Sequence, residues 1–142
     1  MMFAEMVCYL DSAGESVYGV LQGIYEKLGY FVEKATSVTF GGLDGMERMK
    51  NIMLSLREAK YTEIEGTPVL AVSDFVSRVK TNADGSAEAI ELPKTNALKL
   101  HLANGDWICV RPSGTEPKLK FYVATSKATQ REATELADKY LA

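Results

Sequence analysis

The chain has 142 residues, 46% of them hydrophobic and 25% charged, which is the composition of an ordinary globular domain and excludes a disordered or membrane-spanning protein. Its formal net charge of −3 argues against a nucleic-acid partner bound through a broad basic surface. Acidic residues interrupt the amino-terminal apolar stretch, so no signal peptide is expected. We therefore expect a cytoplasmic protein with no membrane partner.

The first 28 residues are predicted to be largely helical. Residues 3–10 are largely apolar, and most of their side chains are expected to be packed. A second helix is predicted to begin at the N-cap Ser16 and to end at Gly29, with apolar residues at helical spacing between them. Residues 30–40 alternate apolar and polar side chains, which predicts an extended linker running into the first strand of the next unit.

A third helix is expected after Gly41 and Gly42. Asp44 and Glu47 have the spacing of a capping box, and the helix should end within residues 57–60. Its apolar residues predict an inward-facing stripe that serves core packing rather than a binding surface. This stripe comprises Met46, Met49, Ile52, Met53 and Leu56.

The second half of the chain indicates strands and a final helix. Residues 69–79 predict a strand and its continuation, and residues 81–87 are rich in turn formers. Asn104 and Gly105 form the strongest short hairpin signal, so residues 97–103 and 107–110 should be antiparallel neighbours. A strand should follow from Leu119, and an amphipathic helix should occupy residues 129–141. This order predicts an α+β fold with a mostly antiparallel twisted sheet and helices packed on one face.

Residues 111–118, R-P-S-G-T-E-P-K, form a polar loop between two apolar strands, and we call them the anion loop. Arg111 and Lys118 supply positive charge, Ser113 and Thr115 supply hydroxyls, and Gly114 lets the backbone turn and present its N–H groups. Together these groups are suited to holding an oxyanion, most commonly phosphate. The same residue types also make ordinary turns, so composition leaves a plain strand connection as the alternative.

The charge of the surrounding segment supports this interpretation. Residues 94–120 contain five basic side chains against two acidic ones, a positive region in an acidic protein. Cys8 and Cys109 lie in apolar surroundings without metal-ligand spacing, which predicts two buried thiols. His101 is more readily a structural histidine than a catalytic one. Tyr122 and Trp107 flank the anion loop and could contact a sugar, but both are also normal sheet residues.

The complete octapeptide resembles the phosphate-binding loop in the last domain of the α-D-phosphohexomutases, the family of phosphoglucomutases and phosphomannomutases. Residues 38–47 and 92–98 also look like that domain. The resemblance implies an α+β fold of the kind seen in the TATA-binding protein. It further implies that residues 1–36 are the tail of a preceding domain plus a linker, and that residues 37–142 are the carboxy-terminal phosphate-binding domain.

The resemblance implies a reversible transfer of phosphate between the 1- and 6-positions of a hexose. This isomerase reaction proceeds through an enzyme phosphoserine, with Mg²⁺ as cofactor and a hexose 1,6-bisphosphate as activator and intermediate. The family's serine, metal and sugar-recognition loops would lie upstream and are not found in this sequence, and we reject Asp44 and Asp84 as metal ligands. No catalytic residue is therefore expected in residues 1–142, and they alone should be inactive.

The resemblance also implies specific roles within the anion loop. Arg111, Ser113, Gly114 and Thr115 would bind the phosphate that is not being transferred, with Lys118 adding charge at the rim. Glu116 is expected to brace the loop by accepting hydrogen bonds from backbone or arginine. A hinge within residues 36–42 would let the domain close over a phosphorylated hexose held by upstream domains of the same chain.

Two alternatives remain at this stage. The chain could be a free-standing, non-catalytic phosphate-binding module, although the expected burial of residues 3–10 argues against this. The loop could also serve a phosphopentomutase or a phosphoglucosamine mutase of the same superfamily. The sequence does not identify the sugar, because the family's sugar-recognition loop is not among these residues.

Overall fold

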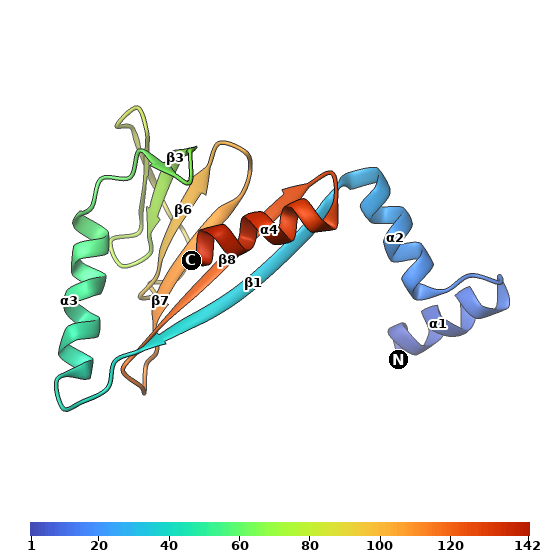
Figure 1. The fold of residues 1–142 in the computed structure, drawn as a ribbon, viewed down its shortest axis with the longest axis horizontal. Coiled ribbons are helices and arrows are strands. Elements are labelled where there is room, and N and C mark those ends of the chain that lie inside the picture. Colours follow the sequence, from blue (N-terminus) through green and yellow to red (C-terminus); the bar gives the residue numbers. More distant parts are fainter.

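The structure is a computed structural model that describes residues 1–142, and its core is a single antiparallel sheet (Figure 1). The strands follow the order β1-β8-β7-β6-β3-β4-β5, and β2 pairs with β3 outside this path. The strands are β1 (Tyr30–Thr39), β2 (Glu63–Ile64), β3 (Thr67–Asp74), β4 (Val79–Asn82), β5 (Ala87–Ala89), β6 (Leu98–Leu102), β7 (Trp107–Pro112) and β8 (Lys118–Lys127). The helices are α1 (Met2–Ser12), α2 (Val17–Leu28), α3 (Gly45–Glu58) and α4 (Gln130–Leu141).

Helices α3 and α4 cover one face of the sheet, and the other face is left open. Strand β8 carries both halves of the core, because Leu119 packs with Met49 and Met53 of α3 while Val123 packs with Ala137 of α4. Leu119 and Val123 are four residues apart, so strand alternation places them on the same face. The predicted α+β fold with helices on one face of a mostly antiparallel sheet is confirmed, and we call the uncovered side the open face.

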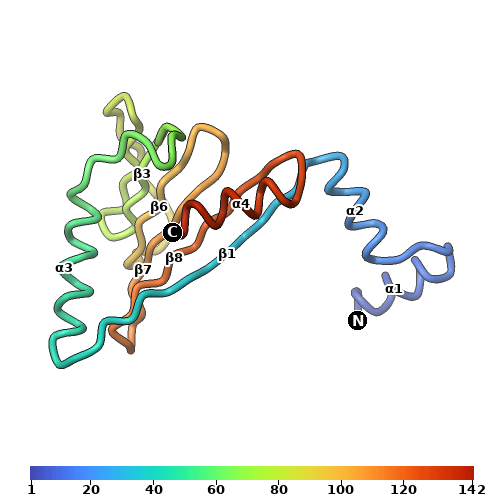
Figure 2. Tube along the Cα trace, viewed as in Figure 1, coloured from blue at the N-terminus to red at the C-terminus, as the bar shows by residue number.

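Strand β1 is a full member of this sheet rather than a linker leading to it. It pairs with β8 along its whole length, from Tyr30 opposite Lys127 to Thr39 opposite Lys118 (Figure 2). Long-range pairing of this kind leaves no trace in a local sequence pattern, which shows only that the segment is extended. The predicted domain boundary between residues 36 and 37 lies inside β1. As a boundary within a longer protein it stays a prediction.

The amino-terminal helices project away from the sheet (Figure 1). The prediction that residues 3–10 pack most of their side chains is wrong, since Leu10 is the one buried residue of α1. Phe3 and Tyr9 are 66% and 71% exposed, because no other part of the chain covers them. Cys8 is exposed and Cys109 is half-buried, so the expectation of two buried thiols is also wrong. None of the helices is long and apolar enough to cross a membrane.

Local signals placed most helix ends correctly. The Ser16 hydroxyl accepts a hydrogen bond from Gly19 N at 3.0 Å, and Thr129 caps α4 in the same way. The predicted capping box of α3 does not form, because Asp44 has helical dihedral angles and its side chain accepts no capping hydrogen bond. Of the predicted stripe on α3, Met49 and Met53 are buried and Leu56 is partly buried, whereas Met46 and Ile52 are 40% and 37% exposed.

Candidate functional site

The anion loop is held by backbone hydrogen bonds at its base. Ser113 N donates to Lys118 O at 2.8 Å, and Lys118 N donates to Glu116 O at 2.8 Å. Phe40 N donates to Pro117 O at 2.8 Å and so joins the loop to the segment that leads into α3. Since Phe40 is buried against α3, the loop is anchored to the core although its tip is exposed.

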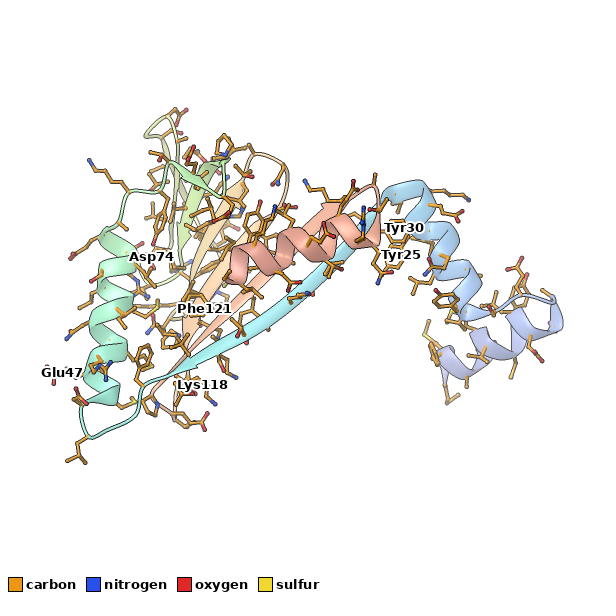
Figure 3. All side chains as sticks on the ribbon, viewed as in Figure 1. Tyr25, Tyr30, Glu47, Asp74, Lys118 and Phe121 are labelled. Carbon is orange, nitrogen blue, oxygen red and sulfur yellow. The ribbon has the colours of Figure 1, made fainter.

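The first turn of α3 packs closely against the loop. A Cβ atom on Gly45 would lie 2.2 Å from Phe40 O and 3.1 Å from Pro117 Cβ, so only glycine permits this approach. In Figure 3, Lys118 lies at the same end of the sheet as Glu47, which belongs to the first turn of α3. The start of α3 therefore buttresses the loop from the covered side of the sheet.

The five residues predicted for the site lie together because they are nearly consecutive. Arg111 is exposed near the end of β7, Ser113 is half-buried, Gly114 and Thr115 are exposed, and Lys118 begins β8. No protein group forms an ion pair with Arg111 or a hydrogen bond with the hydroxyls of Ser113 and Thr115. These groups are free to bind a ligand.

Gly114 has no structural reason to be glycine within the protein itself. Its φ is not positive, and a Cβ atom built there would meet nothing within 4 Å. The sharp turn expected to require this glycine is therefore not the explanation. A ligand that approaches the backbone N–H groups closely would supply the reason, since the absent side chain leaves that space open.

Within the loop, the Glu116 side chain forms an ion pair with a different residue from the one predicted. Its carboxylate pairs with Lys118 Nζ at 3.2 Å rather than with an arginine. This pair is only partly shielded from water and contributes little to stability. It offsets part of the positive charge that Lys118 was expected to add at the rim.

Lys120 was counted in the positive region of the sequence but was not assigned to the site. It lies directly opposite Arg111 in the β7–β8 pairing, on the open face, and forms no ion pair. The signal was present in the alternation of Lys118, Lys120 and Tyr122, which places all three on one side of β8. What this pattern could not show was that this side is left uncovered next to Arg111.

Two other pairs of side chains on the open face, on β6, β7 and β3, are engaged with one another. Lys99 Nζ lies 4.3 Å above the centre of the Trp107 ring. His101 Nε2 lies 3.0 Å from Ser73 Oγ, and partial burial lowers the pKa of His101, with Lys99 and Lys80 adding to the effect. Partial burial also raises the pKa of the Cys109 thiol. A neutral, hydrogen-bonded His101 is a structural residue.

No part of the chain gathers three or more His, Cys, Asp or Glu side chains that could hold a metal ion. Asp84 Oδ1 accepts hydrogen bonds from Ser86 N and Ser86 Oγ at 2.8 and 2.6 Å, which is the arrangement of a tight turn. Asp44 stands alone at the start of α3. The residues present do not fit a magnesium site.

The fold and the loop together define an α+β domain whose exposed strand connection is equipped to hold an oxyanion. Residues 68–141 match a family model described as the C-terminal domain of phosphoglucomutase/phosphomannomutase. The chain belongs to this family. The resemblance found in the octapeptide is thereby confirmed.

Individual relatives agree with the family match. The chain is 35% identical over 127 residues to a phosphoglucomutase of Staphylococcus saprophyticus. This alignment covers 89% of this chain and 23% of the relative. It is 38% identical over 118 residues to a phosphoglucomutase of Staphylococcus epidermidis, and this alignment covers 82% of this chain and 21% of the relative. The chain thus spans about a fifth of the length of the curated relatives it matches.

Among solved structures, the chain is similar to pp63/parafusin, a phosphoglucomutase from Paramecium in its open form. The TM-score is 0.45 at 14% sequence identity, over 89% of this chain and 22% of that one.

Proposed function

We propose that this chain acts as the carboxy-terminal, substrate-phosphate-binding domain of a phosphoglucomutase or phosphomannomutase. The observation that carries the proposal is the anion loop, which is anchored at its base while its ligand-binding groups remain free. Arg111, Ser113, Gly114 and Thr115 would bind the phosphate of the hexose that is not transferred. Lys120 would add an unpaired charge, and Lys118 a partly neutralised one.

In this role the domain contributes binding energy and orientation rather than chemistry. Holding one phosphate fixes the far end of the sugar at the reacting group, which converts remote binding energy into correct alignment. The catalytic serine and Mg²⁺, which would assist phosphoryl transfer when bound, would be supplied by residues outside this chain. A hexose 1,6-bisphosphate would serve as intermediate, and the protein would be cytoplasmic.

Closure of the domain over the sugar would exclude water from the reaction. The hinge expected within residues 36–42 does not suit this motion, because 36–39 belong to β1 and Phe40 is buried. Gly29, between α2 and β1, is a better position. Its φ of +92° favours glycine. The rings of Tyr25 and Tyr30, which flank it in sequence, stack on each other with their centroids 5.2 Å apart (Figure 3).

The exposed apolar residues of α1 and α2 favour a domain that works with an upstream part of the same chain. Phe3, Tyr9 and Leu28 would be covered in such an assembly, and their transfer from water is favourable. The exposure of these apolar residues now argues against a free-standing module, whereas the expected burial of residues 3–10 within the chain did not hold. The sugar remains open among glucose, mannose, glucosamine and a pentose.

An amide NMR titration of residues 1–142 with glucose 1-phosphate at low salt tests the proposal. We expect a dissociation constant on the order of millimolar, because one domain supplies only part of the binding energy. Shifts should concentrate at Gly114, Thr115 and the neighbours of Arg111, and glucose should cause none there. Arg111→Gln should abolish the shifts, whereas the matched Arg131→Gln on exposed α4 should leave them unchanged. Unaltered binding to Arg111→Gln would refute the assigned site.

A further inference from the structure

A second feature of the open face lies beside the anion loop. A shallow, open pocket of about 460 Å³ lies over the paired strands β1 and β8. The pairing places Ser37 opposite Lys120 and Ala35 opposite Tyr122. The residues lining it are Ala35, Thr36, Ser37, Lys120 and Tyr122.

This pocket adjoins the proposed phosphate-binding groups. Lys120 lines the pocket and also lies directly opposite Arg111. Tyr122 follows Lys120 on the same side of β8, at a spacing of about 6.6 Å along the strand. A ligand whose phosphate lies at Arg111 and Lys120 therefore has the Tyr122 ring within reach of the group attached to that phosphate.

The lining has the chemistry that a pyranose ring requires. A sugar presents apolar C–H faces and a rim of hydroxyl groups, so it binds best to an aromatic face accompanied by a few polar groups. Tyr122 supplies the aromatic face and a hydroxyl, and Ser37 supplies a second hydroxyl. Ala35 is small and leaves room above the sheet.

A pocket on the covered side of the sheet also touches the loop but is chemically unsuitable. It has a volume of about 390 Å³ and includes Ser113, together with Met46, Met49 and Met53 of α3. Its exposed lining is mainly apolar although Lys50, Arg57 and Asn96 contribute to it, and Arg57 is already hydrogen-bonded to Asp74 and Asn96. The methionine side of the pocket offers few hydrogen bonds to sugar hydroxyls, whose desolvation there would be uncompensated. The open-face pocket is therefore the better continuation of the phosphate site.

We propose that the pocket over β1 and β8 is a subsite for the sugar ring of the bound phosphorylated hexose. Tyr122 lies against the ring, and Ser37 hydrogen-bonds its hydroxyls. This inference rests on the phosphate-binding role proposed above and adds sugar contacts within the domain itself. The domain then distinguishes a sugar phosphate from a simple phosphate ester before any other domain contributes.

Binding of two phosphate monoesters, methyl phosphate and glucose 1-phosphate, tests this by amide NMR on residues 1–142. We expect glucose 1-phosphate to bind about fivefold more tightly than methyl phosphate, because it gains one aromatic contact. Shifts at Ser37 and Tyr122 should appear with the sugar ester alone. Tyr122→Ser should remove the fivefold advantage and leave methyl phosphate binding unchanged, whereas the exposed control Tyr18→Ser should change neither.

Ser37→Ala provides a second variant that preserves the sheet if Tyr122→Ser fails to fold. It should reduce the advantage of glucose 1-phosphate about twofold, the loss of one hydrogen bond. Equal affinity of the wild-type chain for the two esters would overturn the subsite while leaving the phosphate-binding role intact. Sugar-specific shifts at Met46 and Met49 would overturn it in favour of the covered side. Failure of methyl phosphate to bind at all would overturn both proposals.

Discussion

Arg111 and Lys120 occupy directly opposite positions on β7 and β8, so two like charges face one another across neighbouring strands. No carboxylate pairs with either of them. Like charges placed directly opposite each other destabilise a sheet. An arrangement that costs stability and is left uncompensated within the protein is best explained by a ligand that carries the opposite charge.

Removing one of these charges should stabilise the fold and weaken ligand binding. We expect Lys120→Thr to raise the free energy of unfolding by about 0.5 kcal/mol, because it relieves repulsion and places a β-branched residue in a strand. The same change should weaken binding of glucose 1-phosphate several-fold. Lys127→Thr, on the same strand but far from the loop, is the matched control in both urea unfolding and the NMR titration. Weaker binding by both variants would indicate a general charge effect instead.

Two glycines near the loop should respond differently to alanine. Gly45→Ala should destabilise the fold by about 2 kcal/mol, because its Cβ would overlap Phe40 O, and overpacking a tight contact has a cost of this size. Gly114→Ala should change the free energy of unfolding by less than about 0.5 kcal/mol but weaken phosphate binding, since only a ligand needs that space. Urea unfolding and ligand titration measure the two effects. Full binding by Gly114→Ala would show that the ligand does not approach this backbone.

Asp106 should be important for stability and irrelevant to the ligand. Its side chain is 2% exposed, and it accepts hydrogen bonds from Asn104 Nδ2 at 2.6 Å, Ser126 N at 2.9 Å and the Tyr140 hydroxyl at 3.3 Å. Asp106→Asn should lower the free energy of unfolding by about 2 kcal/mol, because one buried donor loses its acceptor. Asp138→Asn removes a solvent-exposed ion pair with Lys34 and should change it little. Comparable losses in the two variants would contradict this account.

Stability should fall between pH 7.5 and pH 5.5 because of His101, the one histidine in the chain. Burial, Lys99 and Lys80 lower its pKa, so near pH 6.5 the unfolded chain binds more protons than the folded one. The associated stability is present above about pH 6.5 and is lost as pH falls toward the folded pKa. Lys99 stands over Trp107 on the same face, and Ser73 Oγ contacts the imidazole.

His101→Gln should flatten this dependence in urea midpoints measured at the two pH values. Asp84 and Glu88 do not interfere, because hydrogen bonds lower both pKa values from ordinary values of 3.8 and 4.5. A wild-type midpoint that is the same at both pH values would contradict the prediction.

Local sequence signals predicted a large part of this protein. The cap at Ser16, the stop at Gly29 and the hairpin at Asn104–Gly105 were identified correctly, because each depends on interactions within a few residues. The candidate anion loop was recognisable for the same reason, since its binding groups are nearly consecutive. The alternation of β6 also placed His101 and Lys99 together on one side of the sheet.

Other features were decided only by tertiary structure. Alternation divides a strand into two sides, but packing of α3 and α4 determines which side is covered. Register between distant strands places Lys120 opposite Arg111 and Ser37 opposite Lys120, and these pairs are invisible along the chain. The exposure of Phe3 was missed because an apolar helix pattern predicts a face that can be buried, whereas its burial requires a partner surface. The sequence thus determined the elements and the loop, and long-range strand pairing together with one-sided helix packing determined the surface on which the loop opens.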